Sequence, residues 1–328
     1  MKTFLHLACV LALVACSNPG PTLNYLDRPT KQHLRGAAGK GDLIAFSGTH
    51  GTVVVSKDGG ESWEGIKVPG ADSIDFRDIE LRENGSFFIL SAGNPALIFE
   101  SSDCGKSWEP RFNLKNKNIF MDGMAFSPSG EGMAFGDPYE GNLACLVSED
   151  GEKWSFYRSK VLVPRDEEAG FAASGSGIQW LGDGFGFVTG GESGARFIRP
   201  YQGFEVELPL AKGPGAGAFS LATHDNHLVV VGGSYLDSLN RDGNAAYSED
   251  GGLTWKTPKT PPFGYRSVVV HIQSNQYLAA GRTGVDLSND GGKTWKMISS
   301  DGFFTATKLS NHTIALGGRN GKLALVKF

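Results

Sequence analysis

The chain has 328 residues, and its 35 Asp and Glu outnumber its 31 Lys and Arg, which gives a formal net charge of -4. Because this balance provides no general basic field for a polyanion, composition argues against a nucleic-acid-binding protein. Apolar residues make up 40% of the chain and charged residues 20%, as in globular proteins, and the 46 glycines indicate many tight turns.

The first 15 residues have the features of an export signal. Lys2 precedes an apolar run, Leu5 to Ala15, that is too short to span a bilayer. The run ends in Leu13-Val14-Ala15-Cys16, which resembles the lipobox of bacterial lipoproteins, where the Cys thiol receives a diacylglyceryl group. We therefore expect residues 1–15 to be a signal peptide, with an ordinary secretory signal and a coincidental Cys as the alternative.

Lipidation of Cys16 would attach the protein to a membrane through its N-terminal lipid only. Residues 16–21 then form a flexible tether, since Ser17 to Pro21 is rich in turn-forming residues. Ser17 is not the Asp-type signal for retention in the inner membrane. The sequence therefore predicts a location in the envelope of a Gram-negative bacterium, at the outer membrane.

An eight-residue motif recurs along the remaining chain. Ser56 to Trp63 reads S-K-D-G-G-E-S-W, related copies begin at Ser101, Ser248 and Ser288, and a copy one residue shorter begins at Ser148. Five of the six tryptophans lie in these copies, so the repeat is not a coincidence. Its conserved Asp and Trp positions are Asp58, Trp63, Asp103, Trp108, Asp150, Trp154, Asp250, Trp255, Asp290 and Trp295.

The motif has the chemistry of a tight turn between two strands. The Asp carboxylate can accept from turn amides, Gly supplies positive φ, and Trp packs beneath the turn. It resembles the Asp-box, or BNR repeat. A calcium loop is the competing interpretation, but the further carboxylates that calcium needs are missing from the motif.

The repeat spacing predicts an all-β fold, a seven-bladed β-propeller of four-stranded antiparallel blades. Motif starts are 45, 47, 100 and 40 residues apart. The interval of 100 residues fits two units, with a degenerate copy of the motif at Phe197 to Phe204. Turns expected between the first and second strands give an independent count of seven. The last unit has room for three strands only, so we expect Thr22 to Pro29 to supply the fourth and residues 22–328 to form a single domain.

Three arginines are expected to converge at one end of the central channel. Aligning the start of the innermost strand in each unit places Arg35, Arg77 and Arg266 in one register. Asp78 and Asp122 fall nearby, and the turns between the second and third strands on this face carry Asp137 and Arg282. We expect these seven residues to bind a ligand or partner; the competing interpretation is that they only pair with one another.

Other chemistry is weakly supported. Gly213 to Ala218 matches G-x-G-x-x-A, but no helix follows to bind a pyrophosphate. His224 and His227 share a turn without a third ligand, and Cys104 and Cys145 occupy unlike positions in different repeats. We expect no metal, no cofactor, no catalytic residue and no disulfide.

The chain resembles bacterial relatives of the photosystem II stability/assembly factor of plants and cyanobacteria. The resemblance lies in the five boxes, in Asp75-Phe76-Arg77-Asp78-Ile79, in Gly136-Asp137-Pro138 and in Gly170 to Gly175. It implies a seven-bladed binding scaffold with an arginine-rich central docking region. Photosystem assembly itself does not carry over from one sequence.

Two functions of different classes compete. The first is an exported scaffold, expected to be a monomer, that binds an envelope protein or an acidic ligand at the channel mouth. The second is a sialidase-like glycoside hydrolase or lyase, in which Arg35, Arg77 and Arg266 would clamp a sugar carboxylate. The Arg-Ile-Pro phrase typical of sialidases is absent, and no Tyr/Glu nucleophile pair can be assigned, so the scaffold is favoured.

Overall fold

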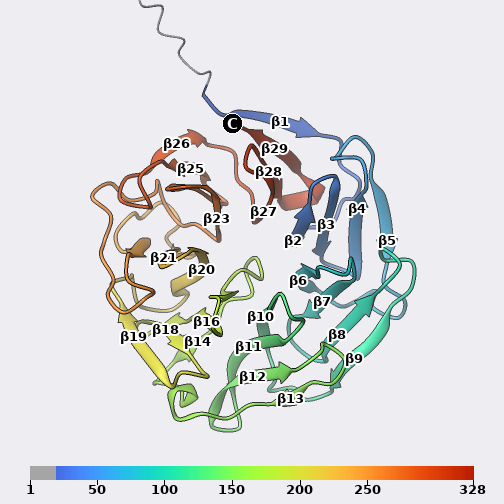
Figure 1. The fold of residues 1–328 in the computed structure, drawn as a ribbon, viewed down its shortest axis with the longest axis horizontal. Coiled ribbons are helices and arrows are strands. Elements are labelled where there is room, and N and C mark those ends of the chain that lie inside the picture. Colours follow the sequence, from blue (N-terminus) through green and yellow to red (C-terminus); the bar gives the residue numbers. More distant parts are fainter. Residues whose placement is uncertain (1–19) are drawn as a thin grey trace, which may run out of the picture.

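The computed structural model describes residues 20–328, so Cys16 and the predicted signal peptide lie outside the described residues. Seven antiparallel sheets stand around a central axis as the blades of a β-propeller, which confirms the predicted fold (Figure 1). No helix within residues 20–328 has the length and apolar character needed to cross a membrane. The only helices there are two short 3-10 turns, η1 (Lys160–Leu162) and η2 (Arg319–Gly321).

Five blades consist of four strands in chain order, with the innermost strand first. Blades 1 to 3 are β2 (Leu34–Lys40), β3 (Leu43–Gly48), β4 (Thr52–Ser56) and β5 (Glu64–Lys67); β6 (Phe76–Leu81), β7 (Phe87–Ser91), β8 (Ala96–Ser101) and β9 (Glu109–Leu114); and β10 (Met121–Phe126), β11 (Gly132–Tyr139), β12 (Asn142–Ser148) and β13 (Ser155–Phe156). Blade 4 is β15 (Ile178–Trp180), β16 (Phe185–Val188), β18 (Ala195–Arg199) and β19 (Phe204–Leu208), and blade 6 is β23 (Val268–Gln273), β24 (Gln276–Gly281), β25 (Gly284–Ser288) and β26 (Lys296–Ser299). The degenerate motif copy at Phe197 to Phe204 therefore joins β18 to β19, as expected.

Blade 5 departs from the four-stranded pattern. It contains β20 (Ala216–His224), β21 (His227–Ser234) and β22 (Ala245–Ser248), and its outer strand is reduced to one bridge between Tyr247 and Lys256. Prolines at 258, 261 and 262 follow that bridge and cannot donate to a strand ladder. On its inner side the sheet gains two short strands, β14 (Glu168–Ala169) and β17 (Gly190–Gly191).

The N-terminal strand closes the ring, as the sequence predicted. Blade 7 contains β27 (Thr305–Ser310), β28 (Thr313–Gly317) and β29 (Leu323–Lys327), and β1 (Thr22–Leu26) pairs antiparallel with β29 along its whole length. The two ends of the described chain meet in this blade, at the top of Figure 1. Leu26 of β1 packs in the cluster that joins blades 7 and 1, so closure buries apolar surface as well as pairing an edge.

The Asp-box turns are fixed by hydrogen bonds from their own residues. In the first box, Ser62 N donates to Asp58 Oδ1 (2.9 Å) and Gly60 N donates to Ser56 Oγ (2.8 Å). Hydrogen bonds to Asp58 from the Ser62 hydroxyl, the Ser62 amide and the Ser56 hydroxyl lower the pKa of Asp58 to about 2. The boxes beginning at Ser101, Ser248 and Ser288 repeat the arrangement, so the Asp carboxylate serves the turn.

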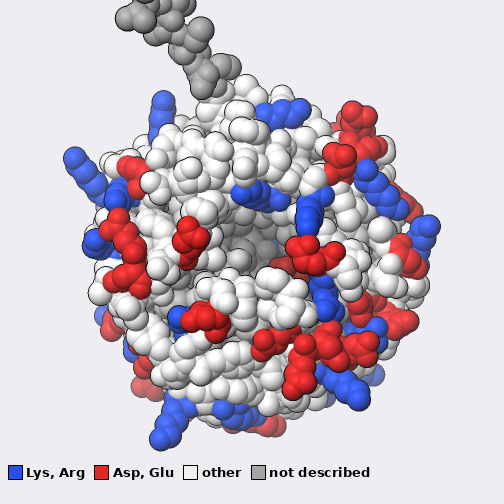
Figure 2. Space-filling view, in the orientation of Figure 1, with Lys and Arg blue, Asp and Glu red and all other residues white. Residues whose placement is uncertain are grey.

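Acidic and basic side chains alternate over the face of the propeller that Figure 2 shows. A hollow opens at the centre of this face, where the innermost strands of the blades surround the axis. The structure therefore has a central channel whose two ends can be compared.

Candidate functional site

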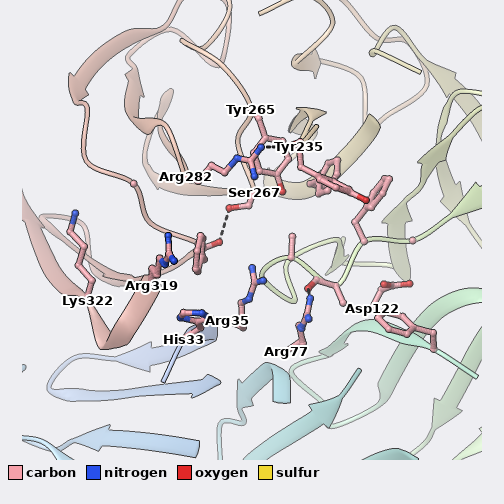
Figure 3. Close-up of a pocket in the computed structure, with 18 residues that line it drawn as sticks. His33, Arg35, Arg77, Asp122, Tyr235, Tyr265, Ser267, Arg282, Arg319 and Lys322 are labelled. Carbon is pink, nitrogen blue, oxygen red and sulfur yellow. Dashed lines mark hydrogen bonds between the residues drawn. The ribbon is translucent and has the colours of Figure 1, made fainter. Parts of the chain in front are cut away.

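A cavity of about 850 Å³ occupies one end of the channel, and we call it the mouth. Its residues come from the segments that precede or begin the innermost strands and from the turns between second and third strands. The polar ones are His33, Arg35, Arg77, Asp122, Tyr235, Tyr265, Ser267, Arg282, Arg319 and Lys322 (Figure 3). The structure thus brings together four of the seven predicted site residues, Arg35, Arg77, Asp122 and Arg282.

β-bulges aim Arg35 and Arg77 into the mouth. Along β2 the pairing with β3 shifts between Leu34 and Gly36, and along β6 the pairing with β7 shifts between Phe76 and Asp78. The arginine is the extra residue in both cases. Because a bulge re-aims the side chain of its extra residue, the flanking Leu34 and Phe76 can be fully buried while each arginine faces the channel.

Arg35 is a cation with no partner in the described chain. Its guanidinium lies over the ring of Phe304, with Cζ 4.5 Å from the centroid, and its Nε is buried without a hydrogen bond among residues 20–328. Burial, together with the nearby charge of Arg77, lowers the pKa of Arg35 to about 10. The group remains charged at neutral pH, so it is a donor available to an anion.

Arg77, in contrast, already has partners. Its Nη1 donates to the carbonyl of Ala172 (3.1 Å), and its Nη2 lies 3.5 Å from Asp75 Oδ2. Arg77 therefore helps to hold the segment from Gly170 to Ala173, which forms part of the mouth wall. The competing interpretation, in which the predicted site residues pair with one another, does not hold for Arg77, which pairs with Asp75.

A buried ion pair fixes the long loop that leads into this segment. Arg196, 2% exposed, donates to both carboxylate oxygens of Glu168 over 2.7 Å and 2.6 Å. Its Nη1 donates to the Val161 carbonyl and to Glu205, and its Nη2 also donates to the Val163 carbonyl. The loop from Ser159 to Gly170 reaches the mouth through Gly170.

Three further cations complete the basic part of the mouth, and two of them were not among the predicted site residues. Arg282 donates to the carbonyl of Tyr235, and Lys322 Nζ lies 3.1 Å from Asp301. Arg319, in η2, is exposed and has no side-chain partner in residues 20–328. Arg319 lies in the turn between the second and third strands of the seventh unit, the same kind of turn that carries Arg282 in the sixth. Lys322 follows that turn, and nothing in the sequence indicated it.

Arg266 does not reach the mouth, so its predicted place is wrong by one residue of register. Its amide donates to Gly232 of the preceding blade (3.0 Å), as the amide of Leu34 donates to Gly318 (3.0 Å). Arg266 therefore occupies the buried position of Leu34, and Ser267 takes the position of Arg35. A shift of one residue along a strand reverses the face that a side chain occupies.

Arg266 instead forms an internal ion pair. The side chain is 0% exposed, and its Nε and Nη2 lie 2.6 Å and 2.5 Å from Asp286 Oδ2. Its Nη1 donates to the Tyr265 carbonyl and to Thr283 Oγ1. The three-arginine clamp that the hydrolase alternative required is consequently not formed by Arg35, Arg77 and Arg266.

Asp122 lines the mouth but is covered, and Asp137 lies behind it. Asp122 is 1% exposed, and neither of its carboxylate oxygens has a hydrogen bond within the described residues. Burial, and then the charge of Asp137, raises the pKa of Asp122 well above its usual value. Asp137 accepts from Gly170 N (2.9 Å) and does not line the cavity, so its predicted position in the mouth is wrong.

Asp78 lies at the opposite end of the channel, so its predicted position in the mouth is also wrong. It lines a second cavity of about 410 Å³ with Glu80, and it accepts from Met124 N (2.7 Å) of the next blade. Burial raises the pKa of Asp78 to about 7, and burial and Asp78 raise the pKa of Glu80. Asp78 faces away from the arginines because it follows the bulge at Arg77.

The raised pKa values predict that the protein loses stability as pH rises. Between the unfolded value of 3.8 and about 7, folded Asp78 keeps a proton that the unfolded chain releases. The free energy of unfolding should therefore fall between pH 5 and 7, by about 1 kcal/mol per pH unit from this group. Urea unfolding of wild type and Asp78→Asn at several pH values measures the slope, which should be smaller in the variant. The exposed Asp72→Asn is the control, and an unchanged slope in Asp78→Asn would contradict the assignment.

Aromatic rings line the side of the mouth across from Arg35 and Arg77. Phe171 and Phe219 are stacked with centroids 3.8 Å apart, and the ring of Tyr265 meets Phe219 edge-on at 4.8 Å. Tyr235 continues this set at 6.4 Å from Phe219 and is 42% exposed. We call these four residues the aromatic wall. They were missed because single aromatic residues in four separate segments form no sequence pattern.

No three His, Cys, Asp or Glu side chains within residues 20–328 come together in a way that could hold a metal ion. Cys104 and Cys145 are both free, and burial raises the pKa of the Cys145 thiol to about 12. The chemical groups at the mouth are guanidinium groups, an ammonium group, hydroxyls, the imidazole of His33, the buried carboxyl of Asp122 and aromatic rings.

Comparison with known proteins connects part of the chain to one family. Residues 40–122 match the family model described as photosynthesis system II assembly factor YCF48. No curated protein matches the sequence. The matched residues include Arg77 and Asp122 and run from the end of β2 to the start of β10.

Solved structures share the fold over nearly the whole chain. YCF48 bound to D1 peptide is 16% identical with a TM-score of 0.64, covering 96% of this chain and 99% of its own. YCF48 from Cyanidioschyzon merolae is 15% identical with a TM-score of 0.66, over 93% and 98%. The WD40 propeller domain of Doa1 is also 16% identical with a TM-score of 0.64, over 94% and 97%. The chain therefore has the seven-bladed β-propeller fold that YCF48 and Doa1 share, and the likeness to both shows that this fold alone does not determine function.

Proposed function

We propose that this protein is a binding scaffold that holds an acidic segment of a partner protein in the mouth. The observation that carries the proposal is Arg35, a charged guanidinium in a cavity where it pairs with no anion among residues 20–328. A carboxylate from a partner would supply the missing acceptor. A charge-assisted hydrogen bond of this kind is stronger in a partly dehydrated cavity than in water.

The surroundings of Arg35 support an anionic ligand. Arg319 is also unpaired in the described chain, and Arg77, Arg282 and Lys322 add charge at the same cavity. The only acidic residue in the cavity lining is Asp122, whose raised pKa reduces its negative charge. A chain with a net charge of -4 thus concentrates positive charge at one end of its channel.

The comparisons support a protein partner. YCF48, a propeller of the same fold, has been solved bound to a D1 peptide, and part of this chain matches that family. We propose a partner in the bacterial envelope, reached by export and by a lipid on Cys16 at the outer membrane. This location rests on the sequence pattern Leu13-Val14-Ala15-Cys16 alone.

Arg35→Gln tests the proposal, because the substitution removes the charge from a side chain that holds no other residue in place. The probe is a labelled eight-residue peptide with three glutamates and a free carboxyl end, titrated at low salt beside its amidated glutamine analogue. Loss of one charge-assisted contact should weaken binding of the acidic peptide about tenfold or more.

Lys40→Gln is the matched control, since Lys40 is an exposed cation that pairs with Glu83 outside the mouth. It should bind the acidic peptide as wild type does, and added salt should weaken binding in both. Equal binding of the acidic and neutral peptides, or no effect of Arg35→Gln, would contradict the proposed function.

A further inference from the structure

The mouth has two chemically different sides. The cations come from four blades: Arg35 from blade 1, Arg77 from blade 2 and Arg282 from blade 6. Blade 7 contributes two, Arg319 and Lys322. The aromatic wall comes from the segment before blade 4, from blade 5 and its long loop, and from the segment before β23. Figure 3 shows Tyr235 and Tyr265 across the cavity from Arg35 and Arg77.

The aromatic wall is held in place by contacts that do not involve a ligand. The amide of Tyr235 donates to the Gly215 carbonyl (3.1 Å), and Arg282 donates to the Tyr235 carbonyl. A side chain at Gly215 would collide with the Tyr235 ring, so the ring lies directly over that glycine. The amide of Tyr265 donates to the Ser238 carbonyl (2.9 Å), which fixes the long loop beside it. A rigid ring surface loses little conformational entropy when it binds another ring.

Tyr265 stands where the two sides meet. It is 6% exposed, it lines the cavity, and its hydroxyl makes no hydrogen bond to another of residues 20–328. It shares the cavity lining with Arg35 and Arg282, and burial, opposed by the charges of these two arginines, raises the pKa of its phenol. An acceptor bound beside the two arginines would take a hydrogen bond from this hydroxyl at the cavity wall.

We propose, building on the proposed function, that the mouth selects a segment in which a carboxylate stands next to an aromatic side chain. The carboxylate accepts from Arg35 and from the Tyr265 hydroxyl. The neighbouring aromatic side chain packs on the exposed part of the wall, where Tyr235 offers its ring. The carboxylate is that of a chain end or of an acidic side chain.

Four short peptides with a common glycine-serine stem test this selection. One ends in Phe with a free carboxylate, one in Ala with a free carboxylate, one in Phe amide, and one in Glu-Phe amide. The Phe acid should bind wild type about tenfold or more tightly than the Ala acid, because only Phe buries a ring. The Phe amide should lose most of this affinity, and the Glu-Phe amide shows whether a side-chain carboxylate can replace the chain end.

Two variants locate the selection in the protein. Tyr235→Ser, at a partly exposed position, should reduce the preference for Phe over Ala while leaving the Ala acid unchanged. Tyr265→Phe keeps the ring and should weaken both acids by a similar factor. Thermal melting checks that each variant is folded, and Lys40→Gln should behave as wild type.

The outcomes separate this inference from the proposed function. If neither acid nor the Glu-Phe amide binds wild type, both fail. If the two acids bind equally well, or if Tyr235→Ser keeps the full preference for Phe, aromatic selection is overturned while binding of acidic segments stands. A Phe preference that falls in Tyr235→Ser supports the inference.

Discussion

Replacing Arg266 with alanine should lower the free energy of unfolding by about 3–5 kcal/mol. The substitution leaves Asp286 as a buried carboxylate with no cation to compensate it, because both side chains are 0% exposed. Asp286 Oδ1 already lacks a hydrogen-bond partner within the described residues, so the remaining Oδ2 would lose its main donor. Urea unfolding at neutral pH measures the loss.

The exposed pair of Lys40 and Glu83 is the matched control. Its atoms are 2.7 Å apart with side chains about 70% exposed, so Lys40→Ala should change stability by less than about 1 kcal/mol. The double variant Arg266→Met, Asp286→Leu should recover most of the loss, because apolar side chains can replace a buried pair without leaving a lone charge. A loss in Arg266→Ala no larger than in Lys40→Ala would contradict this account.

Trp295→Ala should also cost about 3–5 kcal/mol, because it removes a large aromatic side chain from a packed interface. Trp295 is 3% exposed and packs with residues of blades 5 and 6, including Val229 and Tyr277. Its Nε1 donates to the Gly292 carbonyl (3.0 Å), which ties the ring to its own turn. The tryptophan therefore holds neighbouring blades together, and thermal and urea unfolding would show the loss.

Trp108 occupies the same position in the second box and provides a comparison within the protein. It is only partly buried, and its Nε1 has no hydrogen-bond partner in the described chain. Trp108→Ala should therefore be less destabilising than Trp295→Ala. Equal losses in the two variants, or an unchanged melting temperature in Trp295→Ala, would show that burial does not set the contribution of these rings.

The mouth was predictable only in part. Arg35, Arg77 and Arg282 could be found by counting strands and turns, since each lies in a segment that every blade repeats. Asp78 and Asp137 were expected beside them but lie outside the cavity, because alternation and bulges along strands decide the face of each side chain. The aromatic wall and Lys322 required the assembled ring, which brings together residues far apart in the sequence.

The sequence by itself determined the architecture. Five Asp-box copies, the strand turns between them and a last unit one strand short predict seven blades and closure by the segment from Thr22 to Pro29, within which Thr22–Leu26 forms the strand. Each of these signals is local and repeats at the blade spacing. Only the tertiary structure decided which charged residues meet at the mouth. One extra residue at a bulge carries Arg35 into the channel, and the displacement of Arg266 by one position buries it against Asp286. Such one-residue differences leave no trace in the repeat pattern, yet they reverse the side of the strand on which a side chain lies.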